Sequence, residues 1–129
     1  MSTIEIDPDA FPPFQKWSAL CTKHGKAAAL FDNSEPGQKD RSPTGWELEL
    51  AFLAAIEHWT DQEIADLLVA HRRERGHGNE AVDMCTHYSR VILLARGRAE
   101  DTSIEYRRAE EKLAKRQRIE RLFPEGDPR

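Results

Sequence analysis

Arginine and histidine side chains in the second half of the chain are the residues most able to do chemistry. Between positions 71 and 98 there are six arginines and three histidines against three acidic residues. The arginines are Arg72, Arg73, Arg75, Arg90, Arg96 and Arg98. Guanidinium groups bind phosphate through paired hydrogen bonds, so the cluster is compatible with an anionic partner on one face. A solvated helix surface explains the charge alone more simply.

Two cysteine–histidine pairs have the residue types of zinc ligands: Cys21 with His24, and Cys85 with His87. The pairs are separated by 60 residues, and the second spacing is not a common structural-zinc pattern, so we expect no metal site. The sequence has no Gly-x-Ser-x-Gly, no glycine-rich phosphate loop and no His-Glu-x-x-His motif. We therefore expect the chain alone to be non-catalytic.

The composition is that of one small domain without membrane contact. The chain has 129 residues, of which 39% are apolar and 33% are charged. The longest apolar run, Leu50 to Ile56, has seven residues, whereas a membrane span needs about 18. The acidic N-terminus lacks the hydrophobic region of a secretory signal, and two cysteines fit a reducing compartment. These features predict a cytoplasmic protein.

Proline placement predicts an all-α fold, a compact bundle of five or six helices. Residues 44–123 contain no proline, which helix interiors exclude, and no segment alternates as a strand would. Helices are expected at about 13–24, 26–32, 80–97 and 102–123, with two more starting after Ser42 and Thr60. The expected organisation is a flexible N-terminus at 1–11, a helix bundle at 12–100, a charged C-terminal helix at 101–123 that packs on the bundle or extends from it, and a tail at 124–129.

Capping residues and apolar spacing support these helices. Ser42 precedes Pro43 at one start, Thr60 with Glu63 forms a capping box, and Thr102 with Glu105 repeats that pattern. The expected inner faces are Leu48, Phe52, Ile56 and Trp59 on the third helix; Ile64, Leu67, Leu68 and His71 on the fourth; and Cys85, Tyr88, Ile92 and Ala95 on the fifth. Trp46 and Trp59 are expected in the core.

The most specific signal is the stretch 39–76, within a broader similarity over about 14–98. It contains Asp40-Arg41-Ser42, then Trp46 to Ala51 (WELELA), Trp59 to Ile64 (WTDQEI), Leu67-Leu68 and His71-Arg72-Arg73, followed by His87-Tyr88 and later basic residues. This order resembles the helical accessory region of archaeo-eukaryotic-type primase-polymerases from phages, plasmids and mobile elements. His58 stands where the pattern of that family has glycine.

The resemblance implies an accessory helix bundle that holds single-stranded template and the initiating nucleotide for primer synthesis. Its partners would be a primase-polymerase catalytic domain, which supplies the chemistry, and a helicase. The ligand would be ATP or another nucleotide, with no tightly bound cofactor. The nucleic-acid contacts would come from Arg72, Arg73, Arg75, His87, Tyr88, Arg90 and Arg96, with Tyr88 either stacking on a base or packed in the core. Asp40, Arg41 and Ser42 would receive a phosphate at a helix start, although Ser42 also suits an N-cap.

Two other functions remain open from the sequence. One is a protein-interaction module, such as a phage-type inhibitor or an adaptor of a replication enzyme. The acidic first half favours it, because residues 1–69 carry 12 acidic and 5 basic side chains. The other is a helix-turn-helix-like regulator that binds duplex DNA, suggested by the string EIADLL. That motif needs a turn after about Leu68, whereas the helical pattern continues to Gly76.

Overall fold

A computed structural model describes residues 4–76 and 84–122, with side chains through residue 118. Within these ranges the chain forms five helices and no strand, so the predicted all-α bundle is confirmed. The helices are α1 (Phe14–Lys23), α2 (Ala27–Phe31), α3 (Pro43–Ile56), α4 (Asp61–Glu74) and α5 (Met84–Leu122). None of these helices is long and apolar enough to cross a membrane.

The chain divides into two compact units, residues 1–99 and residues 100–129. Helix α5 continues through the boundary, so the two helices predicted at 80–97 and 102–123 are one element, and the capping box predicted at Thr102 is wrong. Between Arg96 and Thr102 the weakest helix former is Gly97, which costs about 1 kcal/mol but leaves the hydrogen-bond pattern intact. In the second unit Tyr106 and Leu113 are exposed.

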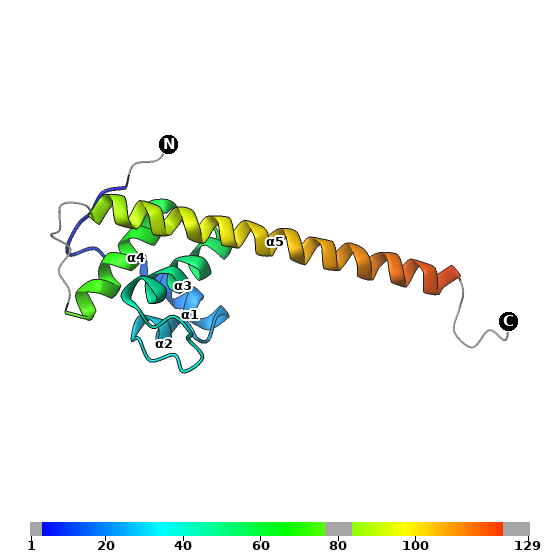
Figure 1. Cartoon of the computed structure of the whole chain (residues 1–129), viewed down its shortest axis with the longest axis horizontal. Coiled ribbons are helices and arrows are strands. Elements are labelled where there is room, and N and C mark those ends of the chain that lie inside the picture. The colour runs from blue at the N-terminus through cyan, green and yellow to red at the C-terminus, as the bar shows by residue number, and fades with distance from the viewer. Residues whose placement is uncertain (1–3, 77–83, 123–129) are drawn as a thin grey trace. The chain divides into compact units, whose positions relative to one another are not determined.

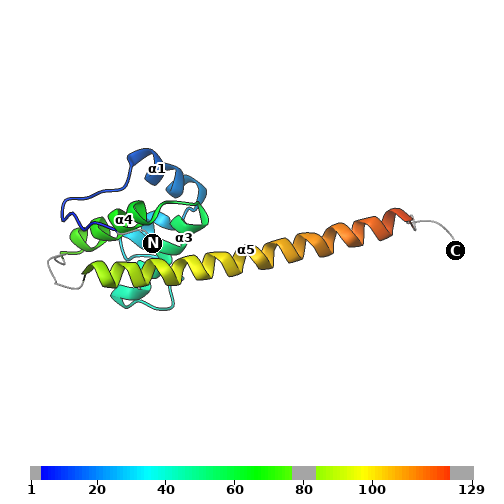
Figure 2. The same cartoon turned by 90° about the horizontal axis from the view of Figure 1, so that it is seen from above.

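Helix α3 is the centre of the first unit. Figures 1 and 2 show α3 and α4 between α1 and the first part of α5. Leu50, Ala51 and Ala54 are fully buried, and Trp46 and Trp59 lie in the same core, as predicted. The predicted stripe is only partly correct, because Leu48 and Ile56 are half-buried. A helix with neighbours on several sides buries residues outside a single stripe.

Helices α4 and α5 complete the core. The Thr60 hydroxyl accepts the amide of Glu63 at 3.2 Å, and the Glu63 carboxylate accepts the amide of Thr60 at 2.8 Å, so this capping box is confirmed. α4 then continues without a turn, as the pattern through Gly76 predicted. On α5 the buried residues are Met84, Tyr88, Val91, Ile92 and Ala95. The exposed Cys85 does not belong to that inner face.

The segment 4–11, part of the N-terminus predicted to be flexible, contacts the bundle. Ile4 is buried, and its carbonyl accepts a 3.6 Å contact from the Cys85 thiol. Glu5 exchanges two backbone hydrogen bonds with the Gln62 side chain, at 2.8 and 2.9 Å. The Arg73 guanidinium donates to the carbonyls of Pro8 and Ala10, both at 2.8 Å. Residues 1–3 lie outside the described residues.

Gly45, in the first turn of α3, lies directly against the loop before the helix. A Cβ atom there would overlap the carbonyl oxygen of Asp40. Gly45→Ala is therefore expected to lower the free energy of unfolding by about 1–3 kcal/mol, because the loop must shift. Gly97→Ala, where a Cβ meets nothing within 4 Å, should instead stabilise the chain by about 1 kcal/mol. Urea unfolding followed by circular dichroism measures both, and equal effects would contradict the close approach at Gly45.

Candidate functional site

The loop before α3 and the end of α4 line an open hollow of about 130 Å³. We call it the arginine pocket. Its walls are Asn33, Arg41, Pro43, Trp46, Glu47, His71, Arg72 and Arg75. Three of these side chains are guanidinium groups, and they come from two segments that are some 30 residues apart in the sequence. The pocket therefore joins part of the predicted phosphate loop to part of the predicted basic cluster.

Within the predicted phosphate loop, Asp40 and Ser42 serve the start of α3. The Asp40 carboxylate accepts the amide of Ser42 at 3.0 Å and its hydroxyl at 2.6 Å, and these hydrogen bonds lower the pKa of Asp40. The Ser42 hydroxyl in turn accepts the amide of Gly45 at 3.1 Å, as an N-cap does. Both residues thus have structural roles, and neither lines the pocket.

Arg41 is the member of that loop that reaches the pocket. Its guanidinium lies 5.1 Å from the ring centroid of Trp46 and donates to the carbonyl of Glu35 at 3.3 Å. The indole N–H of Trp46 donates to the carbonyl of Arg41 at 3.0 Å. Because the side chain of Arg41 is exposed and has no carboxylate partner among the described residues, its charge is available to a ligand.

Arg72 and Arg75 bring two more positive charges from the end of α4. Arg75 donates to the carbonyl of Phe31 at 2.8 Å and lies 3.7 Å from the exposed carboxylate of Asp32. Arg72 lies 3.4 Å from a carboxylate oxygen of Glu47. Arg73 is the exception, because it holds the N-terminal segment and does not line the pocket.

Glu47 is a pocket residue that the sequence analysis did not assign to the site. Its side chain is 2% exposed, and its carboxylate accepts a hydrogen bond from Nε2 of His87 at 3.0 Å as well as pairing with Arg72. One carboxylate therefore links α3, α4 and α5. Acidic residues on helices are mostly solvent-facing, so the residue type alone does not point to Glu47. The signal for Glu47 was its position between Trp46 and the buried run that starts at Leu50.

His71 and Asn33 are two further pocket residues absent from the predicted site. His71 was predicted to lie on the inner face of α4, and it is buried there. Its Nε2 atom lies 2.6 Å from Oδ1 of Asn33, a residue with a positive φ of 56° that ends the turn after α2. This contact connects the turn after α2 to α4 at the edge of the pocket.

Tyr88, for which stacking on a base and packing in the core were both considered, is fully buried in the core. Burial raises the pKa of Tyr88 well above its ordinary value. Of the nearby charges, Arg72 lowers this pKa and Glu47 raises it. Burial in the core leaves no exposed ring face to stack on a base.

The raised pKa of Tyr88 predicts alkaline unfolding. An unfolded tyrosine ionises at about pH 10, so the contribution of Tyr88 to stability is complete below that pH and is lost as the pH rises above it. Tyr106→Phe leaves Tyr88 as the one tyrosine of the chain. In this variant, tyrosinate absorbance at 295 nm should appear together with the loss of helical circular dichroism. Tyrosinate formation with the helical signal intact would contradict the burial.

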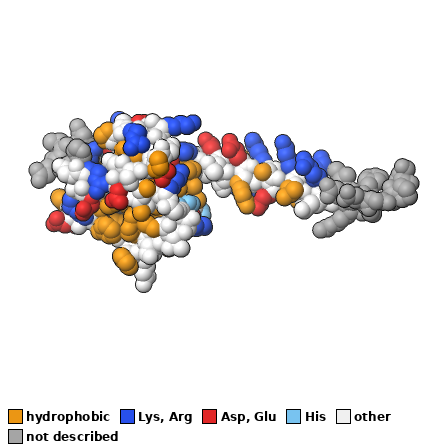
Figure 3. All heavy atoms as spheres, turned by 90° about the horizontal axis from the view of Figure 1, so that it is seen from below, with side chains coloured by type: hydrophobic (Ala, Val, Ile, Leu, Met, Phe, Trp, Pro, Cys, Tyr) orange, Lys and Arg blue, Asp and Glu red, His pale blue; other side chains and the backbone are white. Residues whose placement is uncertain are grey.

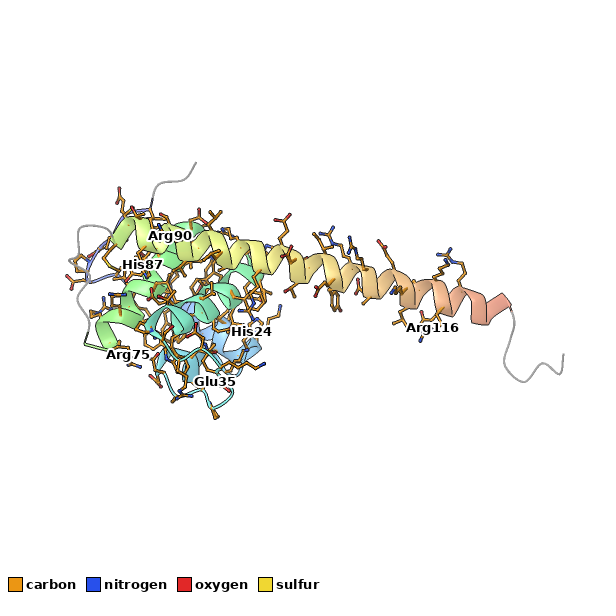
Figure 4. All side chains as sticks on the ribbon, viewed as in Figure 1. His24, Glu35, Arg75, His87, Arg90 and Arg116 are labelled. Carbon is orange, nitrogen blue, oxygen red and sulfur yellow. The ribbon has the colours of Figure 1, made fainter. Side chains whose placement is uncertain are left out.

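The remaining predicted contacts lie elsewhere. Arg96 donates to Asp61 at 2.6 Å and to the carbonyl of Trp59 at 2.8 Å. Arg90 is exposed on α5, and Figure 4 shows it well apart from Arg75 at the end of α4. His87 reaches the site through Glu47 and does not line the pocket. The structure thus gathers Arg41, Arg72 and Arg75, but not Arg73, Arg90 or Arg96.

The cysteine–histidine pairs do not come together. Among the described side chains, no three histidine, cysteine or acidic groups are placed to hold one metal ion. His24 instead contacts Glu57 at 2.9 Å, and His87 contacts Glu47.

The pocket is therefore a small cationic site in an all-α bundle. Comparisons of the chain with protein-family models, with curated proteins and with solved structures found no match.

Proposed function

We propose that this chain is a non-catalytic accessory helix bundle of a primase-polymerase, which holds single-stranded template and the initiating nucleotide. The observation that carries the proposal is the convergence of Arg41, Arg72 and Arg75 on one pocket. Guanidinium geometry matches phosphate, as it matches carboxylate, because two N–H groups meet two oxygens.

Charge and size support a phosphate group as the occupant. The walls carry three guanidinium charges against the single carboxylate of Glu47. The volume of about 130 Å³ is below the roughly 300–1,000 Å³ of pockets that enclose a whole small molecule. A phosphate of a nucleotide or of a strand therefore suits the pocket, with its sugar and base outside.

The backbone at His58 supports the family resemblance independently of the arginines. His58 has a positive φ of 63°, a region that favours glycine. The family pattern has glycine at this position, directly before the Trp59 to Ile64 stretch. The chain thus has the backbone conformation that the family's residue would favour.

In this proposal the catalytic groups belong to a partner polymerase domain, and a helicase is a further partner. The bundle supplies a site where ATP or another nucleotide and a template phosphate bind to guanidinium groups. The origin in a phage, plasmid or other mobile element follows from the resemblance alone.

Titration of labelled oligonucleotides tests the proposal. A single-stranded 12-mer and its duplex are titrated with the full chain by fluorescence anisotropy, with and without ATP, at several salt concentrations. We expect preference for the single strand, with log affinity falling against log salt by about 0.7 for each phosphate contacted. Preference for the duplex would support a duplex-binding regulator instead. Absence of salt-dependent binding would contradict the proposal and favour a protein-interaction module.

A further inference from the structure

Four aromatic side chains form a surface on the α1 side of the first unit. We call it the aromatic surface, and it comprises Phe11, Phe14, Trp17 and Phe31. The ring of Phe31 lies 6.5 Å from that of Phe11 and 5.2 Å from that of Trp17. Phe11 is 45% exposed and Phe14 is 75% exposed. In Figure 1 α1 and α2 lie on the lower side of this unit, and Figure 3 shows hydrophobic side chains gathered on that side.

Separate local features hold these rings in place. The hydrogen bonds from Arg73 to Pro8 and Ala10 fix the segment that ends at Phe11. Pro13 precedes the first turn of α1, and Phe14 and Trp17 are three residues apart on the helix, so they share a face. Phe31 is the last residue of α2. The exposed rings are therefore presented by ordered backbone.

The aromatic surface adjoins the arginine pocket through contacts of Phe31 with two residues. The guanidinium of Arg75 lies 5.9 Å from the ring centroid of Phe31, and the ring of His71 lies 5.8 Å from that of Phe31. Both Arg75 and His71 also line the pocket. A ligand with a phosphate in the pocket would thus have aromatic rings beside its neighbouring groups.

We propose that the aromatic surface stacks the bases of a single strand whose phosphate lies in the arginine pocket. The inference rests on the proposed function and adds a second part to the same site. Cationic groups next to exposed aromatic rings are the combination by which proteins bind single strands without sequence preference. The adjoining guanidinium groups favour this occupant over an apolar protein segment, which would gain nothing from them.

The test separates base stacking from phosphate binding. A thymidine 12-mer is compared with a 12-mer of the same sugar–phosphate length that lacks bases, using the full chain and fluorescence anisotropy. The wild type should bind the thymidine strand at least about tenfold more tightly, because stacking of one base contributes about this factor.

Phe14→Ala should lower affinity for the thymidine strand about five- to tenfold and leave the baseless strand unchanged. Leu93→Ala is the matched control, because Leu93 is 72% exposed on α5 and does not belong to the aromatic surface. It should change neither affinity. Circular dichroism of both variants checks that the helices are retained.

The two proposals fail in different ways. Equal affinity of the wild type for the two strands, or equal losses of both in Phe14→Ala, would overturn the stacking inference and leave the phosphate pocket standing. Binding of neither strand would overturn the proposed function itself.

Discussion

Replacing Arg41 and Arg75 together by glutamine is expected to weaken single-strand binding by about 30- to 100-fold. Each substitution removes a charge-assisted hydrogen bond to phosphate. Because that bond replaces a hydrogen bond to water, it raises the affinity by a factor of about ten or slightly less. Arg72 is left in place, because Glu47 needs its charge. The slope of log affinity against log salt concentration should become shallower by about 1.4, since each of the two lost phosphate contacts contributes about 0.7 to it. Anisotropy titrations between about 50 and 200 mM salt measure both quantities.

The control removes the same charge from other parts of the bundle. Lys23 pairs with Glu57 at 3.0 Å and Arg98 pairs with Glu49 at 2.5 Å, and neither lines the pocket. The double variant Lys23→Gln/Arg98→Gln should change the affinity less than threefold. Its slope of log affinity against log salt concentration should stay within about 0.3 of the wild-type slope. If both double variants lose the same affinity, the binding is a general effect of charge and the arginine pocket is not the site.

The sequence predicted helix starts well where a capping residue coincides with a break in the apolar pattern. Ser42 and Thr60 both follow loop residues and both cap helices in the structure. Thr102 with Glu105 has the same local pattern as Thr60 with Glu63, yet it lies inside α5. A capping box requires an extended N-cap residue, and nothing before Thr102 breaks the helix. Local chemistry alone does not distinguish the two cases.

The candidate site was predictable only in part, because sequence identifies cationic residues but not their partners. Arg73 and Arg96 looked equivalent to Arg72, but their guanidinium groups bind backbone carbonyls of the same chain. The partner of Arg72 is Glu47, whose burial depends on how three helices pack together. The approach of Arg41 to the end of α4 likewise depends on tertiary contacts that no spacing encodes.

Phe11, Phe14 and Trp17 were overlooked for a related reason. None of the three was assigned to a binding site from the sequence, and spacing alone does not distinguish an apolar residue in the core from an exposed one. The structure leaves Phe14 largely exposed and Phe11 half-exposed. The position of Phe11 depends on the path of the segment 4–11, which is held by contacts of Arg73 and Gln62 far along the chain.

Arg72→Ala is expected to destabilise the chain more than any other single arginine substitution on the bundle. It removes one of the two cationic or hydrogen-bonding partners of Glu47, whose side chain is 2% exposed. Removing one partner of a fully buried pair costs about 3–5 kcal/mol. The Arg72 side chain is 24% exposed, so water reaches part of the pair and about 2–3 kcal/mol is the better expectation. Urea unfolding followed at 222 nm measures the loss.

A double-mutant cycle tests the physical reason for that loss. Glu47→Gln removes the buried charge and keeps an oxygen that accepts from His87, so Glu47→Gln/Arg72→Ala should be about 1–2 kcal/mol more stable than the sum of the single effects predicts. Arg98→Ala is the control, because the Arg98 side chain is 45% exposed and its partner Glu49 keeps a second cation, Lys26, at 4.0 Å. Its loss, which includes the contact with the Phe52 ring, should be about 1 kcal/mol. Additive effects in the cycle, or equal losses in Arg72→Ala and Arg98→Ala, would mean that the Glu47 charge does not connect α3 to α4. Recovery in the double variant would instead identify the buried carboxylate as the reason that Arg72 is fixed at the edge of the pocket. The same charge that stabilises the bundle then also presents one of the three guanidinium groups to a phosphate.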